Sequence, residues 1–158
     1  NTTCVIAGPN GTREVASEDF CTGPGQSVIG DGEFLVEMKM PTPQKGFGAA
    51  YQRFTPRNEM DIAVAGVASS VQLDGDTIMS ARVALSAVGP TPILSSAGDS
   101  LAGKEATAEN ISVAAQIASG NASPISDMRG TAEQRTHLVG VLARRTLERA
   151  VERARENN

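Results

Sequence analysis

The β-type segments of this sequence come first and the helical segments come last, and this order constrains the fold most. Turn signals rich in Gly, Pro and Asp separate β-type runs as far as Pro92. Helical spacing of small apolar residues begins after Ser95. Strands and helices that are segregated along a chain do not build alternating βαβ units. The order therefore predicts an α+β fold, in which a small antiparallel β-sheet packs against a C-terminal helical bundle.

Alternating apolar residues and turn signals predict the strands. Asp74-Gly75-Asp76 lies between two long β-type runs and is the clearest hairpin signal in the chain. Apolar and polar residues alternate over residues 34–40, which predicts a strand with one buried face. The predicted strands are residues 3–7 with 12–15 as hairpin partner, 34–40, 49–54, 62–73 and 77–88.

Three helices are expected in the last part of the chain. A short helix is predicted over residues 95–101, and a second over residues 108–119 with Thr107 as N-cap and Gly120 as its end. The third begins at Thr131, whose hydroxyl can accept a hydrogen bond from the backbone of Gln134. One apolar face of this helix consists of Val139, Leu142, Ala143, Leu147, Ala150 and Ala154.

Charge and composition exclude two classes of partner. The 158 residues carry a net charge of −4, with no Trp, one Tyr and four Phe, so both the basic surface and the stacking side chains needed for nucleic-acid binding are lacking. Apolar runs such as residues 62–68 are far shorter than the ~20 residues that span a bilayer. We therefore expect no nucleic-acid binding and no membrane insertion.

The two cysteines, Cys4 and Cys21, lack the spacing of metal ligands. Because no signal-peptide pattern opens the sequence, we expect free thiols in a cytoplasmic protein. A secreted domain with one disulfide is the alternative. The single histidine, His137, has no nucleophile or second ligand near it in the sequence, and no phosphate-binding glycine loop is present. These observations predict a domain without catalytic residues of its own.

A polar cluster follows one of the predicted strands. It consists of Gln52, Arg53, Arg57, Glu59 and Asp61, at the end of the strand over residues 49–54 and in the next loop. A surface ion-pair network accounts for it, and so does a loop that leans on an anionic or hydrogen-bonding cofactor. The residues alone leave both interpretations open.

Motifs that occur in a fixed order along nearly the whole chain resemble one family. They are GTREV at 11–15, EDF at 18–20, TGPG at 22–25, GEFLVEMKMP at 32–41, AYQRF at 50–54, MDIAVA at 60–65, VGPTP at 88–92, PISDMRG at 124–130 and Arg135. The series resembles the C-terminal part of the FAD-binding (medium) subunit of molybdenum hydroxylases, the family of carbon monoxide dehydrogenase and xanthine dehydrogenase.

The resemblance implies a role within a larger oxidoreductase. Residues 1–20 are then the tail of the preceding flavin-binding region, and residues 21–158 are the C-terminal α+β domain of the flavin subunit. FAD is held mainly by an N-terminal region whose glycine-rich loops have no counterpart here. Molybdopterin and iron–sulfur clusters reside in partner subunits, and electrons pass from the clusters to FAD. The chain is expected to form one wall of the flavin site, without being catalytic in isolation.

The resemblance also implies cofactor-binding residues. Leu35 matches an apolar position that touches the isoalloxazine ring in family members, and Arg53 matches a cation near the flavin, which would favour the reduced, anionic form and raise its potential. The loop that Asp61 closes borders the flavin in the family, and Gln52 lies beside Arg53. A non-catalytic interaction or assembly module that shares the fold is the alternative.

Overall fold

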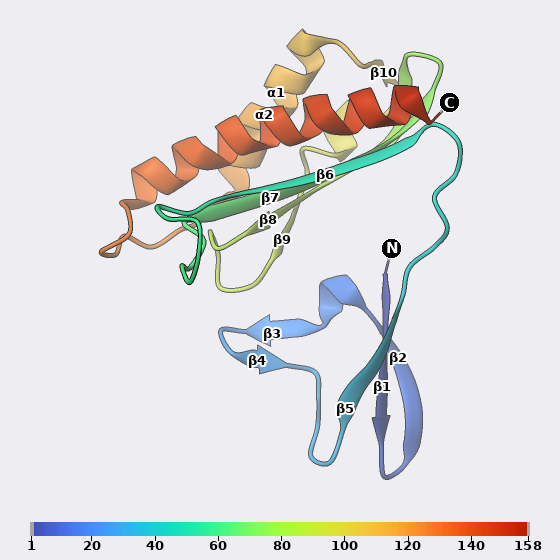
Figure 1. The fold of residues 1–158 in the computed structure, drawn as a ribbon, viewed down its shortest axis with the longest axis vertical. Helices are drawn as coiled ribbons and strands as arrows, with labels where there is room; N and C mark the ends of the chain where they lie inside the picture. Colours follow the sequence, from blue (N-terminus) through green and yellow to red (C-terminus); the bar gives the residue numbers. More distant parts are fainter. Residues whose placement is uncertain (1, 158) are drawn as a thin grey trace. The chain divides into compact units, whose positions relative to one another are not determined.

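The computed structural model describes residues 2–157, and the chain divides into two compact units, Asn1–Pro43 and Gln44–Asn158. In the first unit, three strands form an antiparallel sheet in the order β2-β1-β5 (Figure 1). Two further short strands pair as a hairpin around Pro24 and Gly25. The elements of this unit are β1 (Thr3–Gly8), β2 (Gly11–Ala16), the 3₁₀ turn η1 (Ser17–Asp19), β3 (Cys21–Gly23), β4 (Gln26–Ser27) and β5 (Phe34–Lys39).

The first unit has a very small core. Among residues 2–43, the buried apolar side chains are three consecutive residues of the central strand, Cys4, Val5 and Ile6. The predicted strand over residues 34–40 is present as β5, but the expectation that one of its faces is buried is wrong, since all six of its residues are exposed. No helix or second sheet layer of the first unit covers β5, so the alternating pattern there leaves Phe34 and Met38 in contact with solvent.

The second unit is built on a larger antiparallel sheet. Its strands are ordered β10-β8-β7-β6, and β9 pairs with β8. The strongest predicted hairpin is confirmed: β7 and β8 pair up to Asp74 and Thr77, and Gly75 adopts a positive φ of 57° in the turn. The strands are β6 (Phe47–Phe54), β7 (Ala65–Asp74), β8 (Thr77–Ser86), β9 (Ile93–Ser95) and β10 (Lys104–Glu105).

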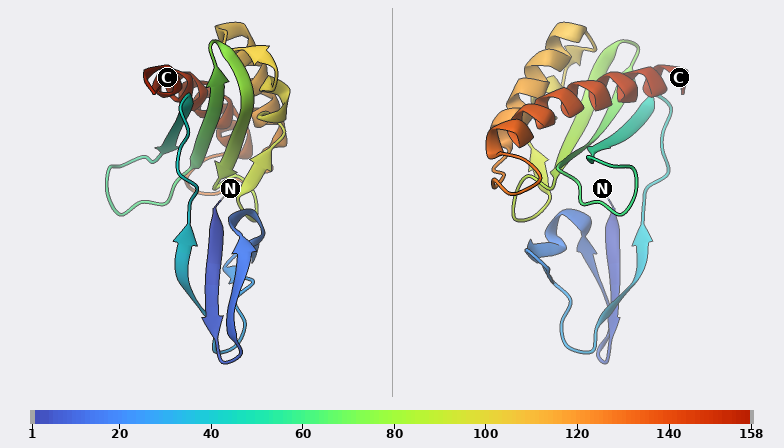
Figure 2. Two further views of the ribbon diagram at one scale, coloured as in Figure 1. Left: turned by 90° about the vertical axis from the view of Figure 1, so that its right-hand side faces the viewer. Right: turned by 60° about the vertical axis from the view of Figure 1, so that its left-hand side comes forward.

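Two long helices, α1 (Ala108–Asn121) and α2 (Ala132–Glu156), cover one face of this sheet (Figures 1 and 2). Both predicted N-caps are confirmed: Asn110 N donates to Thr107 Oγ1 at 3.2 Å, and Gln134 N donates to Thr131 Oγ1 at 3.1 Å. The predicted α+β class, a small antiparallel sheet packed against C-terminal helices, is therefore confirmed. Neither of these helices is long and apolar enough to cross a membrane.

Two helix boundaries differ from the sequence-based expectation. The helix predicted over residues 95–101 is wrong: Ser95 ends strand β9, opposite Val83 of β8, and only the 3₁₀ turn η2 (Asp99–Leu101) follows. The strand pairing overrides the local helical pattern. Helix α1 continues past Gly120 to Asn121, whose Oδ1 accepts hydrogen bonds from Ser95 Oγ at 2.6 Å and from the Ser96 amide and hydroxyl at 3.1 Å each. These tertiary bonds hold the last helical turn in place.

The main core lies between the helices and the sheet. The predicted apolar face of α2 is confirmed, and the helix packs against β6 and β7. At the centre, the hydroxyls of Ser69 and Thr146 hydrogen-bond to each other at 2.8 Å, which satisfies two buried polar groups. Helix α2 crosses β6 so closely that a Cβ atom at Gly48 would overlap the backbone of Ala150 and Ala154. Only glycine permits this approach.

Candidate functional site

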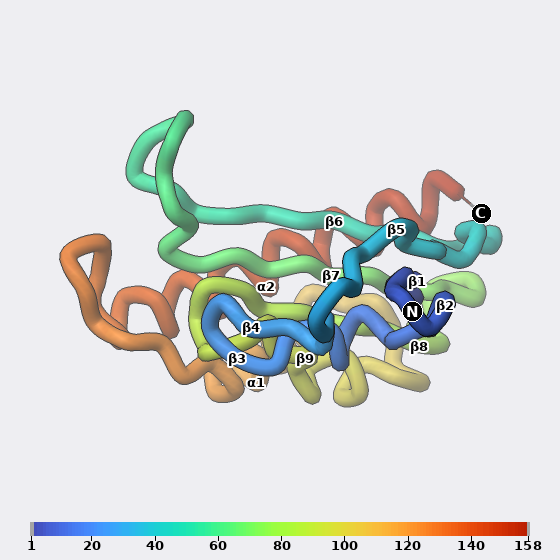
Figure 3. Tube along the Cα trace, turned by 90° about the horizontal axis from the view of Figure 1, so that it is seen from below, coloured from blue at the N-terminus to red at the C-terminus, as the bar shows by residue number. Residues whose placement is uncertain are grey.

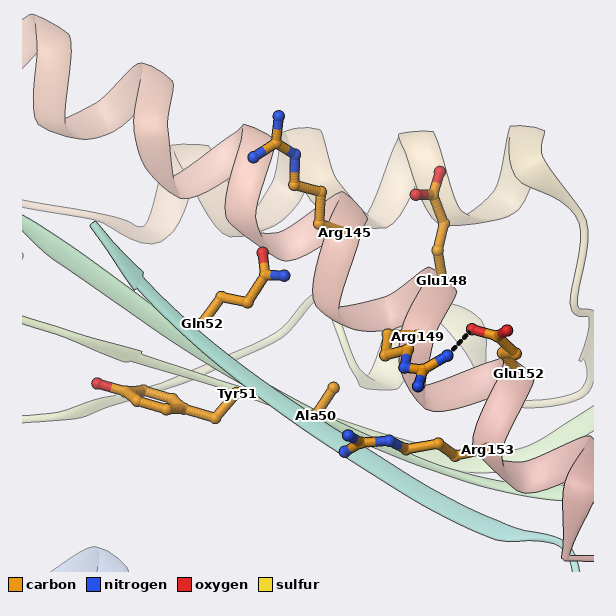
Figure 4. A pocket seen from close by; sticks show the side chains of 8 residues that line it. All are labelled: Ala50, Tyr51, Gln52, Arg145, Glu148, Arg149, Glu152 and Arg153. Carbon is orange, nitrogen blue, oxygen red and sulfur yellow. Dashed lines mark hydrogen bonds and ion pairs between the residues drawn. The ribbon is translucent and has the colours of Figure 1, made fainter. Parts of the chain in front are cut away.

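An open cleft of about 450 Å³ runs between the edge strand β6 and helix α2 (Figure 4). Because side chains alternate along a strand, Ala50 and Gln52 point toward α2, whereas Tyr51 points to the other face of the sheet. The cleft has a strongly charged rim on the helix side. Its lining residues are Ala50, Tyr51, Gln52, Arg145, Glu148, Arg149, Glu152 and Arg153.

Two of the sequence-predicted site residues, Gln52 and Arg53, are neighbours on the exposed second half of β6. By the alternation of the strand, Gln52 lines the cleft and Arg53 lies on the same face as Tyr51. Within residues 2–157, the Arg53 guanidinium has neither an ion pair nor a hydrogen bond. The end of β6 therefore presents an uncompensated positive charge.

The third residue, Asp61, lies in the connection between β6 and β7, which projects beyond the sheet (green in Figure 3). Its Oδ1 accepts a hydrogen bond from Ile62 N at 2.9 Å and lies 3.8 Å from Nε of Arg129. Arg57 donates instead to the backbone oxygen of Met60 at 2.7 Å. The ion-pair network considered for this polar cluster is not formed among the described residues, because Asp61 pairs with the α1–α2 connection and Arg57 with the backbone.

A buried arginine fixes the bases of these loops, and sequence reasoning did not predict its role. Arg135 is 4% exposed and donates to Val64 O at 2.8 Å, to Ala87 O at 3.3 Å and to Asp127 Oδ1 at 2.7 Å. A backbone hydrogen bond from Arg129, and then the Arg135 guanidinium, lower the pKa of Asp127. The signal in the sequence is that Arg135 occupies a position on the apolar stripe of α2, where a charge needs buried acceptors.

The fourth residue, Leu35, belongs to the first unit. It lies on β5 opposite Ile6, and its side chain is 38% exposed. Nearby in the sequence, Glu33 accepts hydrogen bonds from Arg13 at 2.9 and 2.7 Å and from Gly30 N at 2.7 Å. The Arg13 guanidinium and the Gly30 amide lower the pKa of Glu33 to about 2. This ion pair borders a shallow cavity of about 340 Å³ beside the β1–β2 turn.

The described residues supply exposed apolar, amide and guanidinium groups rather than a set of metal ligands. Among residues 2–157, no group of three or more His, Cys, Asp or Glu side chains is placed to hold a metal ion. Cys4 is buried and Cys21 is exposed, and both are free. Such a surface can contact a ligand that another segment holds.

Comparison with protein families gives one matching model. Residues 49–150 match the family described as "CO dehydrogenase flavoprotein C-terminal domain". The matched stretch includes Gln52, Arg53 and Asp61, together with most of the second unit.

Curated relatives and solved structures agree with this match. The chain is 35% identical over 147 residues to the carbon monoxide dehydrogenase medium chain of Hydrogenophaga pseudoflava, covering 92% of this chain and 51% of the relative. It is 28% identical over 148 residues to the xanthine dehydrogenase FAD-binding subunit of Escherichia coli O157:H7, covering 92% and 51%. A chain of reconstituted CO dehydrogenase from Oligotropha carboxidovorans superposes with a TM-score of 0.90 at 34% identity, covering 96% and 53%. The chain thus spans about half the length of the relatives that it matches.

Proposed function

The chain belongs to the CO dehydrogenase flavoprotein C-terminal domain family, and we propose that it forms one wall of the flavin site in the medium subunit of a molybdenum-containing oxidoreductase. In this proposal an N-terminal flavin-binding region, of which residues 1–20 are the tail, supplies most FAD contacts. An iron–sulfur subunit and a molybdopterin subunit are the partners. FAD held at this site would accept electrons from the iron–sulfur clusters of the partner subunit.

The groups present fit a partial flavin site. FAD, when bound, supplies the electron-accepting ring. An isoalloxazine ring has an apolar surface and an edge of hydrogen-bond acceptors, and the exposed Leu35, the Gln52 amide and the Arg53 guanidinium are complementary to those features. These groups are exposed on the surfaces of their own units. Exposed groups suit a contributory wall, with the pyrophosphate held elsewhere.

The observation that carries the proposal is the uncompensated charge of Arg53 at the exposed end of β6. A guanidinium without a carboxylate partner keeps its donors available for a ligand. A positive charge held near the ring stabilises the negative charge that the ring gains on reduction. Arg53 would therefore raise the potential of the bound flavin.

The remaining site residues have supporting parts in this proposal. Leu35 offers an apolar contact, and Gln52 offers an amide from the face of β6 opposite to the Arg53 side chain. Asp61, held by Ile62 N and facing Arg129, fixes the end of the loop over residues 55–64 so that this loop can border the ring. The alternative function is a non-catalytic interaction or assembly module that shares the fold.

Substitution of Arg53 tests the proposal in the medium subunit that carries this domain. At an effective dielectric constant near 20, a unit charge about 4 Å from the ring contributes about 4 kcal/mol, and even 1.4 kcal/mol corresponds to about 30 mV for a two-electron couple. We expect Arg53→Gln to lower the FAD reduction potential by about 30 mV or more. Arg53→Lys keeps the positive charge and should leave the potential close to that of the unsubstituted subunit. Arg144→Gln, on the exposed side of α2, is the control. An unchanged potential in Arg53→Gln contradicts the proposal.

A further inference from the structure

The outer edge of β6 has backbone groups available for one more strand. Strand β6 is the last strand of its sheet, and its even-numbered positions face β7, since Phe54 O accepts from Val64 N at 2.9 Å just before β7 begins. Backbone groups alternate between the two sides of a strand, so the odd-numbered residues direct their N–H and C=O groups outward. The outward positions are Phe47, Ala49, Tyr51 and Arg53.

Side chains of α2 close the first half of this edge. Asn157 Nδ2 donates to Phe47 O at 3.2 Å, and Arg153 Nη1 donates to Ala49 O at 2.5 Å. Four helical residues advance by about 6 Å. Two strand residues advance by about 6.8 Å. Every fourth residue of α2, counted back from Asn157, therefore lies beside every second residue of β6, counted forward from Phe47. The two rows of residues run in opposite chain directions.

The same spacing places Arg149 beside Tyr51 and Arg145 beside Arg53. At these two positions no hydrogen bond joins the helix side chain to the backbone of β6 among the described residues. Arg149 is engaged by Glu152 on its own helix. The Arg145 guanidinium has no ion pair or hydrogen bond within residues 2–157, and Figure 4 shows it turned away from β6. The cleft of about 450 Å³ lies along this unclosed half.

The charge around the cleft selects the kind of occupant. Both acidic side chains on its rim are already paired, Glu148 with Arg144 and Glu152 with Arg149. The charges of Arg145 and Arg153 have no carboxylate partner among the described residues, since Arg153 donates only to a backbone oxygen. The rim thus has an excess of positive charge that carboxylates of a partner would neutralise.

We propose that the edge of β6 at Tyr51 and Arg53 receives an extended acidic segment of a partner protein, which adds a strand to the sheet. The partner backbone pairs with the outward N–H and C=O groups of these two residues, and a carboxylate of the segment contacts Arg145. Strand addition combines main-chain hydrogen bonds with selection by side chains at every second position.

A synthetic peptide tests the proposal on the 158-residue chain. The probe is an acetylated heptapeptide of alternating Glu and Val, compared with the same peptide in which Lys replaces Glu and with one N-methylated on the amides that would face β6. We expect the acidic peptide to bind and to protect the Tyr51 and Arg53 amides from hydrogen exchange. Both altered peptides should bind at least about tenfold more weakly, which corresponds to ~1.4 kcal/mol.

Charge-matched variants separate the site from general electrostatics. Arg145→Gln should weaken binding of the acidic peptide by about tenfold, as expected for loss of a charge-assisted contact. Arg155→Gln, which removes the same charge from α2 but beside Asp76, should leave binding unchanged. Equal weakening by both variants, or full binding of the N-methylated peptide, overturns the proposal. So does concentration-dependent dimerisation through β6 without peptide, which assigns the edge to a second copy of the chain.

Discussion

The two units of this chain differ in how much of their apolar side-chain surface they bury. Every residue of the main hydrophobic core belongs to the unit Gln44–Asn158, where two helices cover one face of a sheet. Within residues 2–43, only three consecutive apolar residues are buried, and strand β5 leaves apolar side chains exposed. Exposed apolar side chains gathered on one strand mark a contact surface. The difference indicates that the second unit has a core of its own, whereas the first buries little apolar surface by itself.

Removal of one core side chain should give the largest effect and confine it to the second unit. Leu147 is fully buried on α2, so Leu147→Ala should lower the free energy of unfolding by about 3–5 kcal/mol. Leu35→Ala, on the exposed β5, should change it by less than about 0.5 kcal/mol. Urea denaturation followed by far-UV circular dichroism measures both. Comparable losses for the two variants would contradict the contrast between the units.

The close crossing of α2 over β6 gives the next effect in size. Gly48→Ala places a methyl group against the backbone of Ala150 and Ala154 and should cost about 2–3 kcal/mol through overpacking. Gly120→Ala is the matched control, because its added Cβ would meet no atom within 4 Å outside its own helical backbone and chain neighbours, and helix propensity favours alanine. Thermal unfolding should show a lowered Tm for the first variant and an equal or raised Tm for the second. A tolerated Gly48→Ala would show that the helix is free to move off the strand.

Acid should weaken the first unit by a smaller amount. The pKa of Glu33 is about 2 in the folded chain, below its ordinary 4.5, because Arg13 and the Gly30 amide stabilise the carboxylate. The stabilisation is complete above pH 4.5 and is lost as the pH falls toward 2. Amide exchange of β1 and β2 should therefore speed up between pH 4.5 and 2 relative to Glu33→Gln, which lacks this titration. Identical pH profiles for the two proteins would exclude Glu33 as the cause.

Local patterns predicted the fold well where a single segment decides the outcome. The Asp74-Gly75 turn, the caps at Thr107 and Thr131 and the apolar stripe of α2 are each set by neighbours in the sequence, and the structure confirms them. The helix predicted over residues 95–101 is wrong, because β9 pairs with β8. This pairing is a long-range interaction that the residues of the segment do not reveal.

The candidate site was less predictable for the same reason. Gln52 and Arg53 could be singled out as polar residues at a strand end, but their lack of ion-pair partners depends on where other elements lie. The Arg135 cluster joins Val64, Ala87 and Asp127, which are far apart in the chain. Only folding brings such groups together, so spacing in the sequence carries little information about them.

Isothermal titration with FAD tests the central claim most directly, namely that this domain contributes a wall to a flavin site held mainly by another region. The account predicts little or no heat of binding for the 158-residue chain alone. It predicts stoichiometric binding by the medium subunit in which this domain follows a flavin-binding region. Tight one-to-one binding of FAD to the isolated chain would contradict the claim.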